Sequence, residues 1–378
     1  MGSEGIRVIS SAFLSLSSIL FFNSKTRERS TKPSSHVCIG GMMHLFELTR
    51  SLVDIESITN HEEAVGSFVF EILSNLAARS GGRVERCPVE ANRFNVFAHW
   101  RSPVVTLSTH LDTVPPFFAS TEDDEFIWGR GSADAKGIVA SMIAAAERLL
   151  ATGTTNFGLL FVVGEERNSA GALAAAHDSR GSRFLINGEP TENKLAVAAK
   201  GILRYEIEAT GRLAHSAYPE LGESAVDKLL DVLQDIRKIP LPEDEVLGPS
   251  TLNIGVISGG RAPNVIADSA RAEIAIRLVN DGNDIRAAVQ RAMAGRAEAR
   301  ELVSIPAMRF NSFDGLPSTI VAYTTDVPAF AGAWGEPFLL GPGSIHVAHT
   351  AEERVAKKQL LDAVEIYERM VKQLLAAS

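Results

Sequence analysis

The sequence predicts an α/β fold: a mixed, mostly parallel sheet flanked by helices, interrupted by a smaller inserted α+β domain. Apolar strands alternate with amphipathic helices up to residue 199, which is typical of a sheet covered on both faces. Between residues 200 and 310 the strands instead alternate apolar and polar residues, so one face is solvated. The first pattern returns at residue 311. We therefore expect a discontinuous larger domain, residues 43–199 and 311–378, with residues 200–310 inserted in it.

Composition indicates a globular chain, since 378 residues suffice for two domains and 45% of them are hydrophobic. The net charge is −9 and there is no basic cluster, which argues against a nucleic-acid partner. The only cysteines, Cys38 and Cys87, argue against a disulfide scaffold and against a thiolate metal site. Any metal would therefore be held by histidine and carboxylate.

The first forty residues differ from the rest. Residues 8–22 are apolar and rich in serine, and residues 25–35 are polar and basic. A secretory signal is one interpretation, but the charges follow the apolar run, which is also shorter than a membrane span. We favour an upstream extension with the functional start at Met42 or Met43. We expect residues 1–42 to be poorly ordered, and the protein to be cytoplasmic with no membrane partner.

The larger domain is expected to begin with helices at 44–58 and 61–80, where apolar residues recur at helical spacing. An Ala-rich helix is predicted at 138–150, and an amphipathic helix at 351–376 ends the chain. The strands predicted for this domain share apolar runs bounded by turn residues; they lie at 84–89, 95–100, 104–110, 157–163, 183–187 and 338–340.

The inserted segment is expected to fold as a ferredoxin-like α+β sandwich. Alternating strands are predicted at 203–210, 251–258 and 270–279, and amphipathic helices at 225–239 and 284–300. A further strand at 302–310 would complete the β-α-β-β-α-β order.

The strand that begins at Val104 ends on a polar pair, His110 and Asp112, before prolines forbid further pairing. Both side chains would point to the same side of an extended backbone, at the edge where open α/β sheets bind ligands. Asp112 could orient the His110 imidazole and leave its other nitrogen free for a metal. A strand end with a satisfied polar pair is the alternative.

Further ligand-type residues also lie at strand or loop ends. Asp134 lies in a glycine-rich loop at a helix start, where a carboxylate is favoured even without a metal. Glu165 and Glu166 are adjacent after an apolar strand, an arrangement that a cation or a solvated turn would make tolerable. Glu189 follows another strand, and His349 precedes the last helix. Such a set suits two divalent metals that share one bridging carboxylate.

These segments closely resemble the co-catalytic zinc amidohydrolases and peptidases. That family includes acetylornithine deacetylase, succinyl-diaminopimelate desuccinylase, aminoacylases and the glutamate-releasing carboxypeptidases. The resemblance covers nearly all of the chain from Met43 and rests on the motifs at residues 108–115, 129–137, 164–166, 169–172, 188–190, 341–343 and 348–350.

The resemblance implies two divalent metals, most naturally zinc, with cobalt or manganese as alternatives. One metal would be bound by His110, Asp134 and Glu189. The other would be bound by Asp134, Glu166 and His349. Glu165 would be the general base, and Asp112 would orient His110.

The resemblance also assigns a role to the inserted domain, which would form a homodimer contact and act as a lid. His215 would stabilise the oxyanion in the partner subunit's site. Asn264 and Arg277 would bind the substrate carboxylate, for which arginine offers a bidentate contact. Weaker candidates for substrate contact are Lys200, Gly343 and Ser344.

The expected function is therefore a dinuclear zinc hydrolase that cleaves the amide of N-acyl amino acids, with acetylornithine deacetylase as the nearest subfamily. A desuccinylase, or a dipeptidase or carboxypeptidase acting on short peptides, is the alternative on the same scaffold. Ala135 replaces the family's usual bulky residue, and no Thr-Asp pair precedes Glu165, which leaves the subfamily open. A non-catalytic binding homologue is the alternative from another class.

Overall fold

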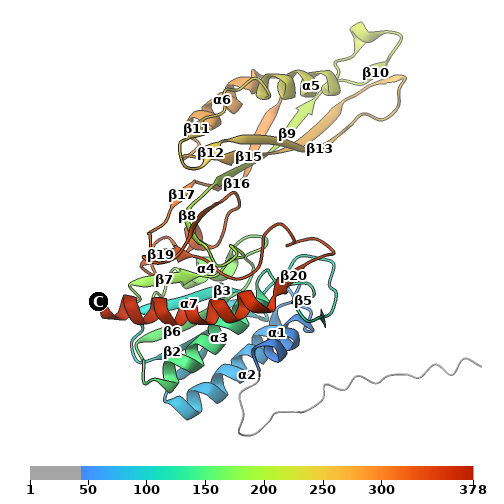
Figure 1. The fold of residues 1–378 in the computed structure, drawn as a ribbon. Coiled ribbons are helices and arrows are strands. Elements are labelled where there is room, and N and C mark those ends of the chain that lie inside the picture. Colours follow the sequence, from blue (N-terminus) through green and yellow to red (C-terminus); the bar gives the residue numbers. More distant parts are fainter. Residues whose placement is uncertain (1–43, 378) are drawn as a thin grey trace, which may run out of the picture. The chain divides into compact units, whose positions relative to one another are not determined.

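A mixed sheet forms the centre of the larger domain (Figure 1). The computed structural model describes residues 44–377, so the predicted extension at 1–42 lies outside the described residues. In the described chain the strand order is β1-β2-β6-β3-β7-β19-β8-β17, with β18 beside β8. Strand β3 (Val105–His110) lies between β6 (Phe157–Val162) and β7 (Phe184–Asn187) and is parallel to both. The predicted mixed, mostly parallel sheet is confirmed.

The remaining strands of this sheet flank that parallel centre. Strands β1 and β2 add an antiparallel edge beside β6, and β19 runs parallel to β7. Their bounds are β1 (Arg83–Glu90), β2 (Arg93–Trp100), β8 (Leu195–Ala199), β17 (Met308–Arg309), β18 (Ser318–Val321) and β19 (Glu336–Leu339).

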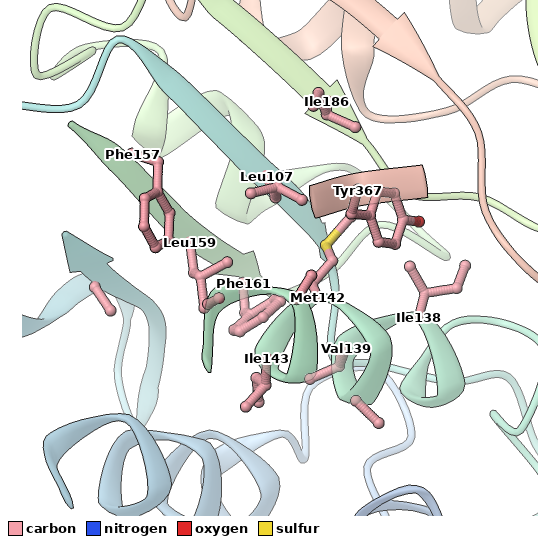
Figure 2. Packing of buried hydrophobic residues seen from close by; sticks show 14 of the residues in the cluster. Leu107, Ile138, Val139, Met142, Ile143, Phe157, Leu159, Phe161, Ile186 and Tyr367 are labelled. Atoms are coloured by element: carbon pink, nitrogen blue, oxygen red, sulfur yellow. The ribbon is translucent and has the colours of Figure 1, made fainter. Parts of the chain in front are cut away.

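Helix α3 (Lys136–Ala151) is apolar on nearly all sides because it is buried between the sheet and other helices. Figure 2 shows Leu107 and Phe161 of the sheet near Met142 of α3, with Tyr367 of the terminal helix on the same core. The other helices of this domain are α1 (Leu45–Val53), α2 (Glu63–Ser80), α4 (Ala170–Ala175), the 3₁₀ turn η2 (Val327–Phe330) and α7 (Lys357–Ala376).

The inserted segment forms an antiparallel sheet in the order β13-β15-β9-β16, with two amphipathic helices covering one face. This is the ferredoxin-like arrangement that the sequence predicts. Its elements are β9 (Gly201–Thr210), α5 (Ala225–Ile236), β13 (Thr251–Gly259), β15 (Ser269–Leu278), α6 (Asn283–Met293) and β16 (Glu298–Ile305).

Two antiparallel strand pairs connect the inserted sheet to the larger one. Met308 of β17 pairs with Ala199 of β8, and Ile305 of β16 pairs with Ile202 of β9. Between these pairs the strands approach so closely that a Cβ on Gly201 would lie 2.2 Å from the Ile305 carbonyl oxygen. Only glycine fits at that position.

Short strand pairs complete the described chain. Strand β10 pairs with β14, β11 pairs with β12, and β20, β5 and β4 form a separate ribbon. Their bounds, with one 3₁₀ turn, are β4 (Thr121–Glu122), β5 (Phe126–Trp128), β10 (Ala214–His215), η1 (Pro219–Leu221), β11 (Glu243–Asp244), β12 (Gly248–Pro249), β14 (Val265–Ile266) and β20 (Arg354–Ala356). No helix among the described residues is long and apolar enough to cross a membrane.

Three of the predicted helices exceed the observed ones by five residues or more. The helix predicted at 44–58 ends at Val53. The helix predicted at 284–300 ends at Met293, because Ala294 and Gly295 take left-handed backbone angles and the next segment pairs with β9. The terminal helix begins at Lys357 rather than 351, because the residues before it form β20 and pair with β5.

Candidate metal centre

His110 is the last residue of β3, and its imidazole is buried at the carboxyl end of the parallel strands. Its Nδ1 lies 3.0 Å from the main-chain carbonyl oxygen of Asp112, and its Nε2 lies 2.9 Å from Oδ1 of Asp134. A carbonyl can only accept, so Nδ1 carries the proton. The Nε2 nitrogen is thereby directed toward the site, as a metal ligand requires.

The Asp112 carboxylate organises the loop that follows β6. Its Oδ1 accepts hydrogen bonds from the main-chain N–H groups of Gly164 and Glu165, at 3.0 and 3.1 Å. Its Oδ2 accepts from the Glu166 N–H at 3.2 Å. Burial would raise the pKa of Asp112, but the interaction with His110 and the hydrogen bonds from the Thr59 hydroxyl and the Glu166 N–H hold it below its usual value. Asp112 therefore positions the two glutamates as well as the histidine.

Asp134 lies between the two candidate histidines. Its Oδ1 faces His110, and its Oδ2 lies 3.2 Å from Nε2 of His349. The carboxylate is only 6% exposed, and the two histidines hold its pKa below the usual value despite burial. One carboxylate that faces two imidazoles has the position expected of a ligand shared by two metals.

Glu166 and His349 complete the second half of the site. The two carboxylate oxygens of Glu166 lie 3.0 and 3.1 Å from Nε2 of His349. Hydrogen bonds to Asp134 and Glu166 raise the pKa of His349 to about 10. His110, Asp134 and Glu166 each offer a ligand atom within 4.8 Å of the others, which is close enough to hold an ion. This trio joins members of both predicted ligand sets through the shared Asp134.

Glu189 and Glu165 bring further negative charge to the same place. Burial raises the pKa of Glu165, and the charge of Glu189 raises it further. Burial likewise raises the pKa of Glu189, with added repulsion from Asp134 despite the attraction of His110. Glu189 is 4% exposed, and its Oε1 has no hydrogen-bond partner among the described residues. A buried carboxylate oxygen without a donor, among oxygen and imidazole ligands, fits a site for divalent cations.

The structure thus brings all five predicted metal ligands to one edge of the sheet, along with Glu165 and Asp112. Their roles remain the prediction made from the motifs. His346, which also precedes the last helix, is exposed on a pocket near Ser344 and makes no contact with this cluster among the described residues.

The predicted substrate residues of the inserted domain form two groups. His215 and Asn264 are neighbours, because β10 pairs with β14 and the Ser216 N–H donates to the Asn264 carbonyl at 3.0 Å. Both side chains are exposed. Arg277 lies on β15, where its Nη1 is buried and has no hydrogen-bond partner in the part of the chain that the structure describes. Burial lowers the pKa of Arg277. Its Nη1 is a free donor for an anionic ligand.

The three weaker candidates have structural partners. Lys200 donates from Nζ to the Pro249 carbonyl at 2.6 Å. The Gly343 N–H donates to the side-chain oxygen of Gln359 at 3.0 Å. Ser344 pairs through its backbone with Thr191, in the turn that follows Glu189. These contacts are all within the protein, and the substrate roles of the three residues stay predictions.

The sequence reasoning missed a buried carboxylate, Asp326, at the start of η2. It is 1% exposed, and burial raises its pKa to about 7, against the opposing effect of Ser169. It lies close enough to Glu189 and Glu165 to raise the pKa of both. It follows no strand end and belongs to no ligand motif, so no signal in the single sequence marked it.

The chain is similar to known proteins over most of its length. Residues 106–373 match the family described as peptidase family M20/M25/M40. A peptidase M20 domain-containing protein from Schizosaccharomyces pombe is 37% identical over 340 residues, which cover 87% of this chain and 84% of the relative. A protein named as a probable carboxypeptidase from Aspergillus flavus is 37% identical over 373 residues, covering 86% and 89%.

Solved structures have the same fold. An aminopeptidase PepT from Bacillus cereus has a TM-score of 0.73 at 21% identity, covering 88% of this chain and 98% of that chain. A metallo-carboxypeptidase of the M20 family from Sulfolobus solfataricus has a TM-score of 0.72 at 14% identity, covering 88% and 99%. A dinuclear metal-binding peptidase from Bacillus subtilis has a TM-score of 0.63 at 16% identity, covering 87% and 97%.

Proposed function

Because the chain belongs to peptidase family M20/M25/M40 and is a metallohydrolase of that family, we propose that it is a carboxypeptidase. It would cleave the amide bond before a residue that carries a free α-carboxylate. Membership confirms the family expected from the motifs. The relatives named as probable carboxypeptidases favour the peptidase alternative over the acetylornithine deacetylase that we expected first.

The observation that carries this proposal is the unpartnered guanidinium nitrogen of Arg277. A buried donor without an acceptor is costly, and a carboxylate from the substrate would satisfy it with a charge-assisted hydrogen bond. A peptide C-terminus and an N-acyl amino acid both present such a carboxylate next to the scissile amide. The two substrate classes therefore differ only in the acyl group.

The metal set fits the same chemistry. His110, Asp134 and Glu189 would hold one divalent ion, and Asp134, Glu166 and His349 a second. When bound, the pair would supply Lewis acidity that makes a water more acidic and polarises the scissile carbonyl. Glu165 would accept the proton from the attacking water and deliver it to the leaving amine. The identity of the metal, with zinc as our expectation, is part of this proposal.

We also propose that the protein is a homodimer formed through the inserted domain. Exposed apolar side chains gather on its edge strand β13 and on α5, with Val256 at 44%, Ile257 at 56% and Leu230 at 52% exposure. An unpaired strand edge that carries apolar residues is a ready template for pairing with a second copy.

The test of the carboxypeptidase proposal compares N-blocked dipeptides with free and amidated C-termini, with N-acetyl amino acids as a third class. We expect hydrolysis of the free acids and little of the amides. Arg277→Gln should lower kcat/KM for the free acid by about 10- to 100-fold through KM, since a hydrogen bond to a charge is lost.

The matched control is Arg271→Gln, which removes an arginine from the same strand, where it pairs with Glu206 at the surface. It should leave kcat/KM unchanged. Equal cleavage of acid and amide would overturn the proposal. Preference for N-acetyl amino acids over dipeptides would instead restore the deacetylase.

A further inference from the structure

Glu353 is a buried carboxylate that none of the roles above uses. Its exposure is 0%, and it lies four residues after His349 and directly before β20. Its Oε1 accepts hydrogen bonds from the main-chain N–H groups of Gly131, Ala133 and Asp134, at 2.9, 3.3 and 3.2 Å. Backbone N–H groups that converge in this way form a concavity that binds an anion.

The other carboxylate oxygen of Glu353 pairs with Nη1 of Arg130 at 2.5 Å, and Arg130 is itself 1% exposed. The Nε of Arg130 donates to the Pro116 carbonyl at 3.2 Å, in the segment that follows Asp112. Glu353 and Arg130 thus connect the three segments that carry Asp112, Asp134 and His349.

The backbone reinforces this connection. The Gly129 N–H donates to the carbonyl of Glu353 at 3.1 Å, and the next residue, Arg354, pairs with Trp128 of β5. Strands β20 and β5 lie side by side in Figure 1. The ladder fixes which residue of the loop after β5 faces Glu353, and so aligns the Asp134 loop with the turn that carries His349.

Glycine is needed where the loop meets Glu353. Gly131 has a φ of +86°, which favours glycine, and a Cβ there would lie 2.8 Å from a methyl carbon of Thr113. The loop therefore cannot take this path with an ordinary residue at 131. Glycine in the motif around Asp134 thus allows the backbone to curve around the Glu353 carboxylate.

The buried carboxylate of Glu353 accepts hydrogen bonds from four donors, so its charge is satisfied within the protein. It has no oxygen left to accept a hydrogen bond from a substrate. Its contribution must therefore be geometric. Resting on the proposed function, we propose that Glu353 is a positioning residue that sets the separation of Asp134 and His349, and thereby the affinity for the metal ion that these two residues share. The relevant separation is the 3.2 Å between Oδ2 of Asp134 and Nε2 of His349.

The test replaces Glu353 with alanine and with glutamine and measures metal binding by calorimetry with zinc or cobalt. Glu353→Ala should weaken the ion shared by Asp134 and His349 by about 10- to 100-fold, as loss of an outer-shell partner does. Glu353→Gln keeps one oxygen for the backbone N–H groups but loses the ion pair. The metal affinity of Glu353→Gln should lie between those of the wild type and the alanine variant, at least threefold below the wild type, for the same reason.

The visible absorption of the cobalt-loaded protein gives a second readout, because it reports coordination geometry and not stability. Leu73→Ala is the control: Leu73 is fully buried in α2, so the variant loses stability by creating a cavity, but its metal affinities and cobalt spectrum should match the wild type.

The outcomes separate the two proposals. A wild-type protein that binds fewer than two ions would overturn the proposed function and this inference with it. A wild type that binds two ions, with Glu353→Gln and Glu353→Ala indistinguishable from it in affinity and spectrum, would overturn the positioning role alone. If Glu353→Ala does not fold, the glutamine variant decides: wild-type affinity rejects the inference, and a threefold or larger loss supports it.

Discussion

Glu165 and Glu166 are adjacent in sequence and held by the same carboxylate, yet they face different groups. Glu166 contacts His349 directly, whereas the pKa of Glu165 is raised by burial and by the charge of Glu189. Asp112 fixes the main-chain N–H groups of both residues. The proposed division of roles, with Glu165 as base and Glu166 as metal ligand, is therefore consistent with how this loop turns.

Glu165→Gln should retain both metal ions but lower kcat by about 10²- to 10⁴-fold, because only proton transfer is removed. Metal content measured by elemental analysis, together with steady-state kinetics, checks this. Glu368→Gln on α7, where the glutamate pairs with Lys372 at the surface, should leave both quantities unchanged. Near-normal turnover of Glu165→Gln would show that another group is the base.

At the level of single residues, Asp134 follows β5 of a separate ribbon and His349 lies well beyond β19, so the strand pattern alone does not bring them to the site. The predicted ligands His110, Glu166 and Glu189 could be found from that pattern, because each follows a parallel strand of the larger sheet. Parallel strands bring their carboxyl ends to one edge, so such residues meet in space. Asp326 and Glu353 were not predictable in the same way. Asp326 follows an irregular loop, and Glu353 lies where the amphipathic pattern of the terminal helix conceals the start of β20.

At the level of elements, strongly periodic segments were predicted well and their ends less so. Helix α6 ends at Met293 because a left-handed turn and pairing with β9 override the apolar spacing that continues beyond it. The terminal helix begins late for a similar reason, since β20 pairs with β5, which lies 226 to 230 residues earlier in the chain. Only the tertiary fold brings segments that far apart in sequence together, and it overrides local helix propensity here. Local sequence periodicity cannot predict pairing between strands that are far apart in the chain.

Asp244 gives an element-level prediction about pH. Its carboxylate accepts hydrogen bonds from the Leu247 N–H, from Arg309 and from the Val246 N–H, which lower its pKa to about 2. A folded pKa below the unfolded value of about 3.9 stabilises the fold above that pH, and the stabilisation is lost as the pH falls toward 2.

We therefore expect Asp244→Asn to be less stable than the wild type at pH 5 to 7, and the difference to shrink as the pH drops below 4. Urea unfolding at a series of pH values, as far down as the protein stays folded, measures this. Asp231→Asn, at an exposed position of α5, should show no difference at any pH. A difference for Asp244→Asn that is independent of pH would contradict the role of its charge.

At the level of the whole molecule, variants of His215 can show whether each active site is built from residues of two subunits. Among the described residues, His215 and Asn264 make no hydrogen bond or ion pair with the predicted metal ligands of their own chain. If His215 serves the partner subunit, then His215→Ala and Glu165→Gln homodimers should both be nearly inactive, but their mixture should recover activity.

Random mixing makes half of the dimers mixed, each with one complete site, so about a quarter of wild-type activity should return. A mixture of Glu165→Gln with Glu189→Gln is the control. Each change damages the site of the subunit that carries it, so a mixed dimer has no complete site and no activity should return. No recovery in verified mixed dimers, or a monomer at assay concentration, would rule out the shared site.

The two strand pairs that connect the inserted sheet to the larger one bring the start and the end of the insertion together at one place. Because Ala199 pairs with Met308 and Ile202 with Ile305, the whole insertion occupies the place of a hairpin turn between two neighbouring antiparallel strands. Every predicted metal ligand lies outside that hairpin, whereas His215, Asn264 and Arg277 lie inside it. If the proposed roles hold, a single excision of the insertion, closed with a tight loop, would remove substrate recognition and leave the ion-binding residues in place.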